Sequence, residues 1–543
     1  MRAFGFEVTG NQDVQNRAFN LPGADRARVA ACGAAGLTAG GFALLLLLML
    51  SLGLRRGMNH DESQYLAAGA VFGRHLLLPY RDFPYFHMPD LVLIYGALFR
   101  WCGSVLLAAR LFSVAAGWLT SLVLWLMAWR ECRGKPALVH WLLPAGAALL
   151  LVSNPIFRDA FWRTWNHAPA TLFGMVAVAF AMGAGRDGRG LPWVRWFGSG
   201  LFIGLAIGTR LTFAPLIAPL AVAAVLEPGG GNLCERARRV AIFCGGAALS
   251  LLPALILFAL APAQFLFGNF TFNSKVNVLF RQSYHDTRAG FSAKLLFPFT
   301  TLLRDPANLL LALLFVGFVA AALSRIFKMP REARYRLLLV LSLVPFTLIG
   351  AVAPSPSQHE YYYALVPLMV LGIALSAAEF STGGRAWLCL LLLLAGAAFA
   401  TARTWNEYQR LAILKTPSEW APVKFHEAGV EAAQWVRAGC VLTLNPIYPI
   451  EGGLDIYPAL VTGGIAWRTE RFVPPADRVR FQILGPDNFE SVMEQRPPGA
   501  VLTTPSSELD PPLIAWAQAH GYAAHPLQAR GKLVDQATVW TAR

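Results

Sequence analysis

Two neighbouring acids, Asp61 and Glu62, are the side chains of this 543-residue sequence with the clearest chemical potential. They follow a long apolar run, 29–54, by a few residues. A carboxylate near hydrocarbon is partly desolvated, which raises its pKa and makes it a better proton acceptor near neutral pH. The alternative is purely structural, because Asn59 could cap a helix whose dipole stabilises both acids.

Arg210 is a second candidate because it stands between two short apolar runs, 197–209 and 211–226. A charge at membrane depth is costly and by default marks a functional site. Arginine also suits the bidentate binding of a phosphate group. The alternative is an arginine whose apolar stem lies in the membrane while its head group reaches the aqueous interface.

Polar residues also gather just before the apolar run 167–185. Asp159 lies in the preceding loop, Asn166 is the last residue of that loop, and His167 is the first residue of the run. They are candidate acid and substrate-binding residues. The same loop carries tryptophans of the kind found at membrane interfaces, so an interfacial belt is the alternative.

Two later segments hold the remaining candidates. Lys275 and Arg281 are cations that could face a phosphate, although most of the polar stretch around them is typical of a solvated loop. His359 and Tyr362 lie where the chain re-enters an apolar run. The tyrosines there are typical of an interfacial belt, and the alternative is a binding cavity.

The composition places these residues in a membrane protein. The sequence is 56% hydrophobic and 14% charged, whereas soluble domains are about 25% charged. Its uncharged runs are long enough to cross a hydrocarbon core about 30 Å thick. We therefore predict an all-α polytopic membrane bundle of about eleven transmembrane helices, over residues 29–54, 104–129, 137–153, 167–185, 197–209, 211–226, 240–262, 306–324, 337–353, 361–379 and 387–403.

The distribution of basic residues predicts the orientation of this bundle. With a cytoplasmic tail at 1–28, all the strongly basic loops of an eleven-span protein fall on the cytoplasmic side, as the positive-inside rule requires. The net charge of +15 is explained in this way, and a nucleic-acid partner is excluded. The apolar stretch 91–98 then becomes a membrane-grazing helix. Within the transmembrane domain, 29–404, the outer loops are 55–103, 154–166 and 263–305.

Residues 405–543 are predicted to form a separate small α/β domain on the outer side. Helices over 425–438 and 511–520 each end at a glycine. The segments 440–444 and 500–504 are short, rich in β-branched residues and bounded by proline or glycine, which is typical of strands.

Other catalytic classes lack their signatures in this sequence. Its seven cysteines are scattered without a CxxC pair, which argues against a disulfide framework or a zinc site. It has no Walker loop, no GxGxxG after a strand and no Ser-His-Asp set. We predict no cofactor and no metal site; a divalent metal is an alternative for which the sequence shows no ligand cluster.

The first outer loop resembles one enzyme family. The pattern consists of Asp-Glu-x-x-Tyr at 61–65, Pro-Tyr-Arg-Asp-Phe at 79–83 and Tyr-Phe-His-Met-Pro at 85–89. It is similar to the opening of the lipid-carrier-dependent glycosyltransferases of the type C fold, which include the lipid A aminoarabinose transferases and the protein O-mannosyltransferases. The resemblance covers roughly residues 55–370 and is concentrated in 58–90.

The resemblance implies roles for the residues of this loop. Asp61 would be the acid that the family requires for transfer, and Arg81, Asp82 and His87 would contact substrate. His87 stands where the family usually has a lysine. Glu62 would help to orient the acceptor.

It also implies roles for residues further along the chain. The family often has a second acid at the start of a later span, where this sequence has Asn166 and His167, so Asp159 is the nearest acid for that role. A similar Gly-x-Arg turn in the family supports Arg210 as a phosphate ligand. A related aromatic segment followed by proline places His359 and Tyr362 near the carrier-binding cavity.

The implied reaction is an inverting sugar transfer at the outer face of the bacterial inner membrane. A polyprenyl-phosphate sugar in the bilayer would donate the sugar to a hydroxyl acceptor on a glycolipid, polysaccharide or protein. Asp61 would accept the proton of that hydroxyl, and Arg210, with Lys275 or Arg281, would bind the phosphate. The alternatives are a secondary transporter or lipid-carrier flippase, and a non-catalytic assembly protein. Against a transporter, the sequence lacks a pair of interrupted helices in matching halves.

Overall fold

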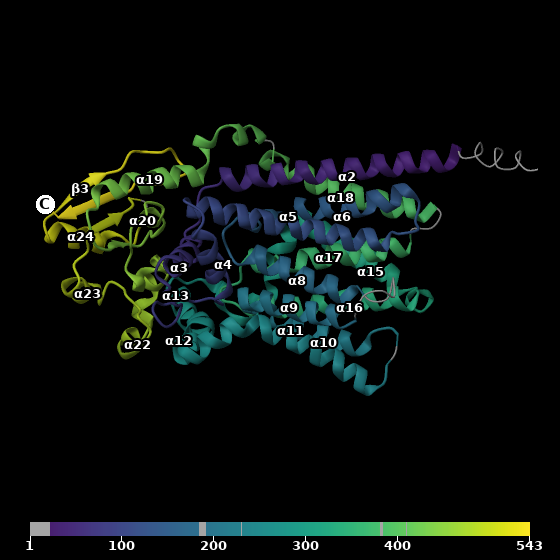
Figure 1. Cartoon of the computed structure of the whole chain (residues 1–543), viewed down its shortest axis with the longest axis horizontal. Helices are drawn as coiled ribbons and strands as arrows, with labels where there is room; N and C mark the ends of the chain where they lie inside the picture. The colour runs from purple at the N-terminus through teal and green to yellow at the C-terminus, as the bar shows by residue number, and fades with distance from the viewer. Residues whose placement is uncertain are drawn as a thin grey trace, which may run out of the picture.

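The computed structural model describes residues 22–183, 192–229, 231–380, 384–408, 410–505 and 507–542. Long helices run side by side along one axis, and a mixed α/β domain lies at one end of them (Figure 1). This arrangement confirms the predicted fold class, a helical membrane bundle with a small C-terminal α/β domain.

Each of the predicted apolar runs forms a helix. In the described ranges, seven helices are long and apolar enough to cross a membrane, and shorter apolar helices lie beside them, so the chain is a multi-pass membrane protein. The helices at the predicted positions are α2 (Pro22–Arg55), α5 (Val105–Glu131), α6 (Ala137–Ser153), α8 (His167–Met182), α9 (Pro192–Thr209), α10 (Ile217–Leu226), α11 (Leu233–Leu260), α15 (Pro306–Leu323), α16 (Arg331–Val352), α17 (Leu365–Glu379) and α18 (Gly384–Tyr408).

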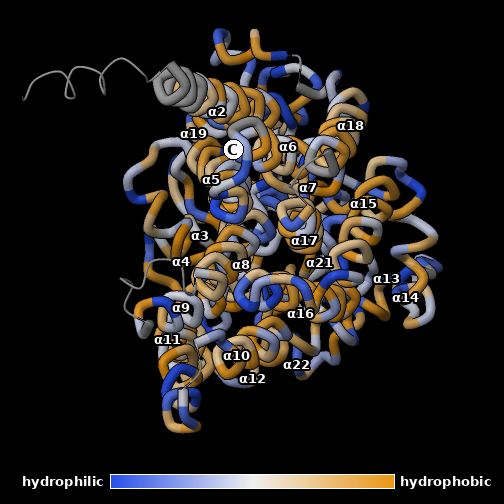
Figure 2. The backbone as a smooth tube through the Cα atoms, turned by 90° about the vertical axis from the view of Figure 1, so that its right-hand side faces the viewer, coloured by the Kyte–Doolittle hydropathy of each residue, from blue (hydrophilic) through white to orange (hydrophobic). Residues whose placement is uncertain are grey.

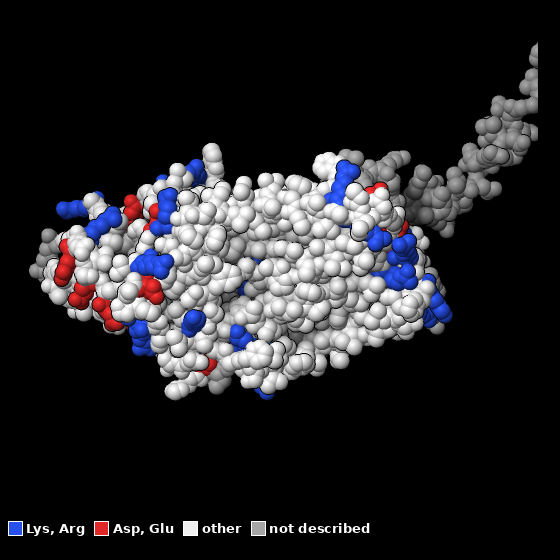
Figure 3. Space-filling model, turned by 90° about the horizontal axis from the view of Figure 1, so that it is seen from below, with Lys and Arg blue, Asp and Glu red and all other residues white. Residues whose placement is uncertain are grey.

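Hydrophobic residues dominate the bundle along its length. Seen along its axis, its helices are mostly orange on the hydropathy scale (Figure 2). On the face shown in Figure 3, charged side chains gather at the two ends of the molecule and leave the middle almost free of them. An uncharged band between two charged ends is what a membrane-spanning bundle requires.

The predicted first outer loop is largely helical. It contains α3 (Glu62–His75) and α4 (Asp90–Phe99), and α4 confirms the helix predicted over 91–98. The two helices pack closely because glycines remove side chains from the contact. A Cβ at Gly73 would lie 2.7 Å from the carbonyl oxygen of Gly96, and one at Gly69 would meet the Cβ of Tyr95 at 2.5 Å. This close contact fixes the position of α3, the helix that begins directly after Asp61.

The other two predicted loops are also helical. Asn154 caps the short helix α7 (Pro155–Ala160) by accepting from the backbone N–H groups of its first turn. The stretch 263–305, interpreted from the sequence as a solvated loop, instead forms mainly helices, because its phenylalanines pack against neighbouring elements. They are α12 (Pro262–Leu266), the π-helix η2 (Phe267–Val276), α13 (Asn277–Ser283) and α14 (Phe291–Thr300).

The C-terminal domain is built on a four-stranded sheet of order β1-β2-β4-β3. The strands β1 (Val441–Thr443) and β2 (Ala500–Thr503) confirm the predicted pair and run parallel, whereas β4 (Thr538–Ala542) pairs antiparallel with β2 and with β3 (Tyr522–Pro526). The strands β3 and β4 were not predicted from the sequence.

Helices surround this sheet. The predicted helix over 511–520 is α24 (Pro511–Ala519). The helix predicted over 425–438 is α19 (Ala421–Trp435), which ends before Gly439 because Val436 is already extended. The remaining helices of the domain are α20 (Ile447–Glu451), α21 (Gly464–Thr469), α22 (Pro475–Arg480) and α23 (Phe489–Gln495).

A buried carboxylate attaches the C-terminal domain to the bundle. Glu451, at the end of α20, accepts a hydrogen bond of 2.6 Å from the backbone N–H of Leu106 in the first turn of α5. A carboxylate at a helix N-terminus satisfies an otherwise free N–H and interacts favourably with the helix dipole. Arg74 of α3 donates to the carbonyl oxygens of Ile450 and Leu454 at 2.6 and 3.1 Å. The domain therefore contacts both α5 and the first outer loop.

Candidate functional site

A cavity of about 710 Å³ lies where the bundle, the outer loops and the C-terminal domain meet. It has a polar part and an apolar part. The apolar part includes Leu211, Pro215, Phe270 and Ile349. The charged and titratable residues that line the cavity are Asp61, Tyr65, His87, His167, Arg210, Arg281, Glu360, Tyr361 and Arg468.

Asp61 reaches this cavity from the residue before α3. Its backbone N–H donates to Oδ1 of Asn59 at 3.0 Å, and Asp61 itself occupies the N-cap position of the helix. The predicted capping role of Asn59 is therefore wrong, because Asn59 instead closes the turn that precedes the helix. One oxygen of the Asp61 carboxylate lies 3.1 Å from Nε2 of His60.

The charges around Asp61 keep its carboxyl group ionised. Burial alone would raise its pKa, but the hydrogen bond to His60 and the charges of His60 and Arg468 outweigh burial, and the pKa lies below its usual value. The predicted rise of the Asp61 pKa is therefore wrong. A carboxylate with this pKa is unprotonated at neutral pH and is ready to accept a proton.

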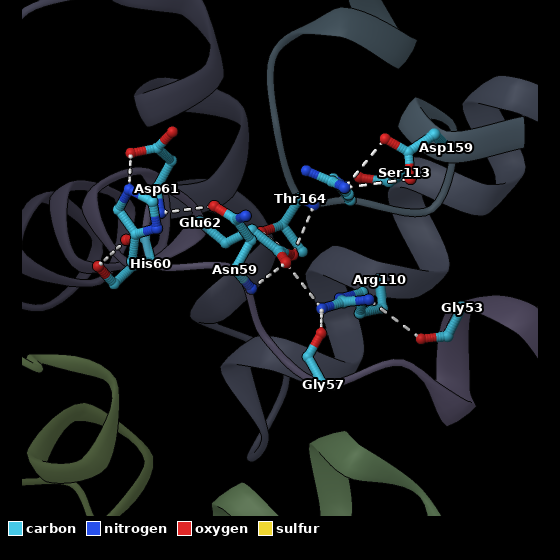
Figure 4. Close-up of polar contacts among 12 residues, drawn as sticks. Gly53, Gly57, Asn59, His60, Asp61, Glu62, Arg110, Ser113, Asp159 and Thr164 are labelled. Carbon is cyan, nitrogen blue, oxygen red and sulfur yellow. Dashed lines mark hydrogen bonds and ion pairs between the residues drawn. The ribbon is translucent and has the colours of Figure 1, made fainter. Parts of the chain in front are cut away.

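Glu62 does not line the cavity, and its side chain points toward Arg110 of α5 (Figure 4). One of its oxygens lies 2.9 Å from Nη2 of Arg110, and the other accepts from the backbone N–H and the hydroxyl of Thr164 at 2.9 and 3.0 Å. The carboxylate also accepts from the N–H of Asn59 at 2.8 Å. Both charges of the pair are buried. The structure therefore does not bring Glu62 to the cavity but uses it to join the start of α3 to α5.

Arg210 projects into the cavity from the break between α9 and the 3₁₀ turn η1 (Leu211–Leu216). Its Nη1 donates to Oδ1 of Asn166 at 2.7 Å, and its Nε donates to the hydroxyl of Thr212 at 3.1 Å. The guanidinium also lies over the ring of Tyr361, at 5.2 Å from its centroid. A guanidinium held from three sides without a carboxylate partner in the described ranges is well placed to bind an anion.

Two histidines flank this arginine on the cavity wall. His167 is buried, its two ring nitrogens have no hydrogen-bond partner, and its ring is nearly parallel to that of Tyr361. The ring of His87 stacks on Tyr65 with centroids 4.8 Å apart. Burial, together with the charge of Arg210, lowers the pKa of His87 to about 3, so this imidazole is neutral at physiological pH. It can hydrogen-bond a substrate but cannot replace the charge of a lysine.

Asp159 and His359 bind each other beside the cavity without lining it. The distance from Nε2 of His359 to Oδ2 of Asp159 is 2.9 Å, and Arg163 binds the same carboxylate at 3.0 Å. These bonds lower the pKa of Asp159 and offset the effect of its burial, which would raise the pKa. Asp159 and His359 are therefore engaged with each other, with Arg163 and with Glu360 outside the cavity lining, and their roles in the site stay predictions.

Four further predicted residues also lie outside the cavity lining. Arg81 and Asp82 form an ion pair of 2.8 Å with each other at the surface. Lys275 is exposed on η2. Tyr362 is buried against Phe297, and its neighbour Tyr361 lines the cavity instead. A 3₁₀ turn over 359–362 decides which of the tyrosines faces inward, and such a local twist cannot be deduced from composition.

The cavity also contains residues that the sequence analysis missed. Arg468, on α21 of the C-terminal domain, lines the same space as Asp61 and contributes to lowering the Asp61 pKa. Nothing near Arg468 in the sequence signals a site, because the fold alone brings it to the first outer loop. Arg110 lies outside the cavity lining and binds Glu62. It had a detectable signal, because it is a lone arginine early in a predicted span and such charges usually have buried partners.

No arrangement of metal ligands was found in the described ranges, where no three His, Cys, Asp or Glu side chains group closely enough to hold an ion. The predicted absence of a cofactor stays a prediction.

Comparison with solved structures identifies the fold. ArnT from Cupriavidus metallidurans bound to undecaprenyl phosphate aligns with this chain at a TM-score of 0.59 and 13% identity, over 93% of this chain and 98% of ArnT. The apo state of ArnT from the same organism aligns at a TM-score of 0.51 and 13% identity, over 92% and 98% of the two chains. No protein-family model and no curated protein matches the sequence. The predicted type C glycosyltransferase fold is confirmed.

Proposed function

Because the chain has the type C glycosyltransferase fold, we propose that it moves a sugar from a polyprenyl-phosphate carrier to a hydroxyl acceptor at the outer face of the inner membrane. The observation that carries this proposal is the cavity, in which an ionised carboxylate, Asp61, and a buried guanidinium, Arg210, line one space. A base for a hydroxyl and a cation for a phosphate are the two groups that such a transfer needs.

The reaction is a single displacement at the anomeric carbon. The acceptor oxygen attacks this carbon while its proton passes to the carboxylate of Asp61. The bond between the carbon and the phosphate oxygen breaks, and the phosphate leaves with the electron pair on the opposite face, which inverts the configuration. Arg210 stabilises the negative charge on the leaving phosphate. No nucleotide takes part, which suits an enzyme that works outside the cytoplasm.

The apolar part of the cavity lining supports a donor with a lipid tail. Four apolar residues line the same cavity as Arg210, and three of them follow it closely in the sequence. They are Leu211, Ala214, Pro215 and Ile349. In the proposed complex the phosphate binds Arg210 and the first isoprene units lie against these residues. The carrier bound to ArnT, undecaprenyl phosphate, has the same combination of an anion and a long apolar chain.

The charge distribution supports an outward-facing site. In Figure 3, the charged side chains at the end of the bundle far from the C-terminal domain are mostly Lys and Arg, whereas the end with the domain carries both signs. Basic ends of membrane bundles lie in the cytoplasm. In this orientation the cavity and the C-terminal domain lie on the outer side.

The proposal is tested by transfer with the purified protein reconstituted in liposomes. Polyprenyl-phosphate sugars labelled in the sugar serve as donors, and lipid and polysaccharide fractions of a bacterial envelope serve as the acceptor mixture. We expect Asp61→Asn to lower the release of free polyprenyl phosphate by about 100- to 10,000-fold, the usual contribution of a general base. Glu494→Gln is the matched control, because Glu494 is an exposed acid of the C-terminal domain.

The results separate the proposal from its alternatives. Transfer that survives Asp61→Asn would show that Asp61 is not the base. Movement of the labelled carrier across the liposome membrane without transfer, in wild type and variant alike, would support a flippase. Neither activity in the wild type would support an assembly role.

A further inference from the structure

Two arginines from different parts of the chain lie close to the same aromatic ring at the cavity. The guanidinium carbon of Arg468 lies 5.1 Å from the ring centroid of Phe280, and that of Arg281 lies 5.6 Å from the same centroid. Arg281 belongs to α13, and Arg468 belongs to α21 of the C-terminal domain, which packs against α13. Both arginines line the cavity.

The carboxylates around this pair offset its positive charge only in part. The carboxylate of Asp286 lies 3.8 Å from Arg281 but binds Arg288 more closely, at 2.8 Å. In the described ranges, Arg468 has no carboxylate at ion-pair distance. The carboxylate of Asp61 stabilises the charged form of Arg468 from a greater distance, whereas the positive charge of Arg281 destabilises it.

Hydrogen-bond donors without partners also indicate that this pair binds an anion. Nε of Arg281 and Nε of Arg468 are both buried, and neither has a hydrogen-bond partner. A buried donor without a partner is destabilising, and more so when it is charged. Two neighbouring guanidinium groups with free donors are the arrangement that binds a phosphate oxygen, because each planar fork can present two N–H groups to it.

We propose that Arg468, together with Arg281, binds a phosphate group of a substrate, and that the C-terminal domain is therefore part of the binding site. This inference rests on the function proposed above and adds a second cationic position to that of Arg210. The phosphate belongs either to the lipid carrier or to the acceptor, and the chemistry of recognition is the same for both.

The domain is fixed firmly enough to place this side chain. Phe481 stacks on Phe267 of η2 with centroids 4.1 Å apart, and Gln482 donates to the carbonyl oxygen of Arg81 at 2.9 Å. Helix α21 begins after Gly463, which has a φ of 56° and packs closely on the carbonyl oxygen of Leu444. A residue with a Cβ would be strained there, so this glycine helps to set the direction of the helix that carries Arg468.

The test measures binding by the full-length protein in detergent, without an acceptor. Wild type, Arg468→Gln, Arg468→Lys and Arg281→Gln are titrated with undecaprenyl phosphate and, separately, with inorganic phosphate. Arg471→Gln is the matched control, because Arg471 is an exposed arginine three residues further along the same domain. Thermal unfolding of each variant shows whether it is folded.

We expect Arg468→Gln and Arg281→Gln to weaken the binding of undecaprenyl phosphate by about 10- to 100-fold, as the loss of a charged hydrogen bond does. Arg468→Lys should recover part of the affinity, and Arg471→Gln should bind like wild type. If only the affinity for inorganic phosphate falls, the pair binds a phosphate of the acceptor. Unchanged affinity for both ligands in folded Arg468→Gln would overturn the inference. Failure of the wild type to bind undecaprenyl phosphate would instead contradict the proposed function.

Discussion

Asp61 and Glu62 are neighbours in the sequence, but their side chains have opposite surroundings. Asp61 faces the cavity with His60 beside it, whereas Glu62 is buried against Arg110 and Thr164. A helix begins at Glu62, so the two side chains leave the chain in different directions. The sequence could identify the acid pair, but only the direction of this first turn separates the candidate base from the structural partner.

The lowered pKa of Asp61 leads to a prediction about pH. A base is competent while it is ionised, so activity that depends on Asp61 should persist as the pH falls and be lost only below the ordinary pKa of about 3.9 for aspartate. We expect no acidic limb with a midpoint above pH 5 in a profile of kcat/KM. Arg468→Gln removes one of the cations that lower this pKa and should move the limb to higher pH. A wild-type limb near pH 6 would contradict the assignment of Asp61 as the base.

The pair of Glu62 and Arg110 gives a prediction about stability. Their exposed fractions are 0% and 1%, so Glu62→Gln leaves a guanidinium buried without its carboxylate. Breaking a buried pair in this way costs about 3–5 kcal/mol. We expect a large fall in the thermal unfolding temperature for Glu62→Gln and for Arg110→Gln, and a smaller fall for the double variant than the two single falls would sum to. Asp61→Asn should unfold near the wild-type temperature. Equal stability of Glu62→Gln and wild type would show that the ion pair is dispensable.

At the scale of elements, the position of Asp61 depends on the contact between α3 and α4. Glycines hold the two helices close together, and the nearest atoms to Gly73 belong to the backbone of Gly96, which cannot move aside as a side chain can. Backbone strain of this kind shifts a whole helix. Any shift of α3 moves the carboxylate that precedes it.

Gly73→Ala should therefore reduce both stability and transfer. The added methyl group would lie 2.7 Å from the Gly96 carbonyl oxygen, and overpacking of this kind costs about 1–3 kcal/mol. Gly103→Ala is the control, because an added Cβ there would meet nothing within 4 Å. Thermal unfolding and transfer rates of both variants measure the effect. If Gly73→Ala matched Gly103→Ala in both measurements, the close packing of α3 on α4 would not position the site.

The elements that could be predicted are those with a strong local pattern. The apolar runs predict helices such as α5 and α16 because length and hydrophobicity suffice to define them. The π-helix η2 has no such pattern, since its phenylalanines and asparagines take their positions from tertiary contacts. Strand β3 contains a proline and has no alternating pattern, so its pairing with β4 depends on the sheet that is already present.

At the scale of the whole molecule, the C-terminal domain is attached where it can affect the cavity. Glu451 binds the first turn of α5, the same helix that holds Glu62 through Arg110. Arg468, which belongs to the same domain, lines the cavity. Long-range arrangements of this kind arise from folding of the entire chain. The part of the candidate site formed by the bundle and its outer loops could therefore be predicted from the sequence, at Asp61, His87, Asn166, His167, Arg210 and Arg281, but Arg468 could not.

The orientation of the whole molecule is the last condition for the proposed reaction. A carrier-dependent transfer outside the cytoplasm requires the end with the C-terminal domain to face outward. Trp101 near the first outer loop, Val479 in the domain and Phe327 at the far end are strongly exposed, at 88%, 82% and 90%. Each is therefore suited to replacement by a cysteine in a chain from which the seven native cysteines have been removed.

We expect a membrane-impermeant maleimide to label Trp101→Cys and Val479→Cys in intact spheroplasts, and to label Phe327→Cys only after the membrane is permeabilised. The reason is that the basic residues near Phe327 keep that end in the cytoplasm. Transfer activity of the cysteine variants shows that each is folded. Labelling of Phe327→Cys in intact cells, with Trp101→Cys protected, would place Asp61 and Arg210 on the cytoplasmic side. A cavity on that side would face nucleotide-activated sugars, so the proposed reaction would have to be replaced by one that uses them.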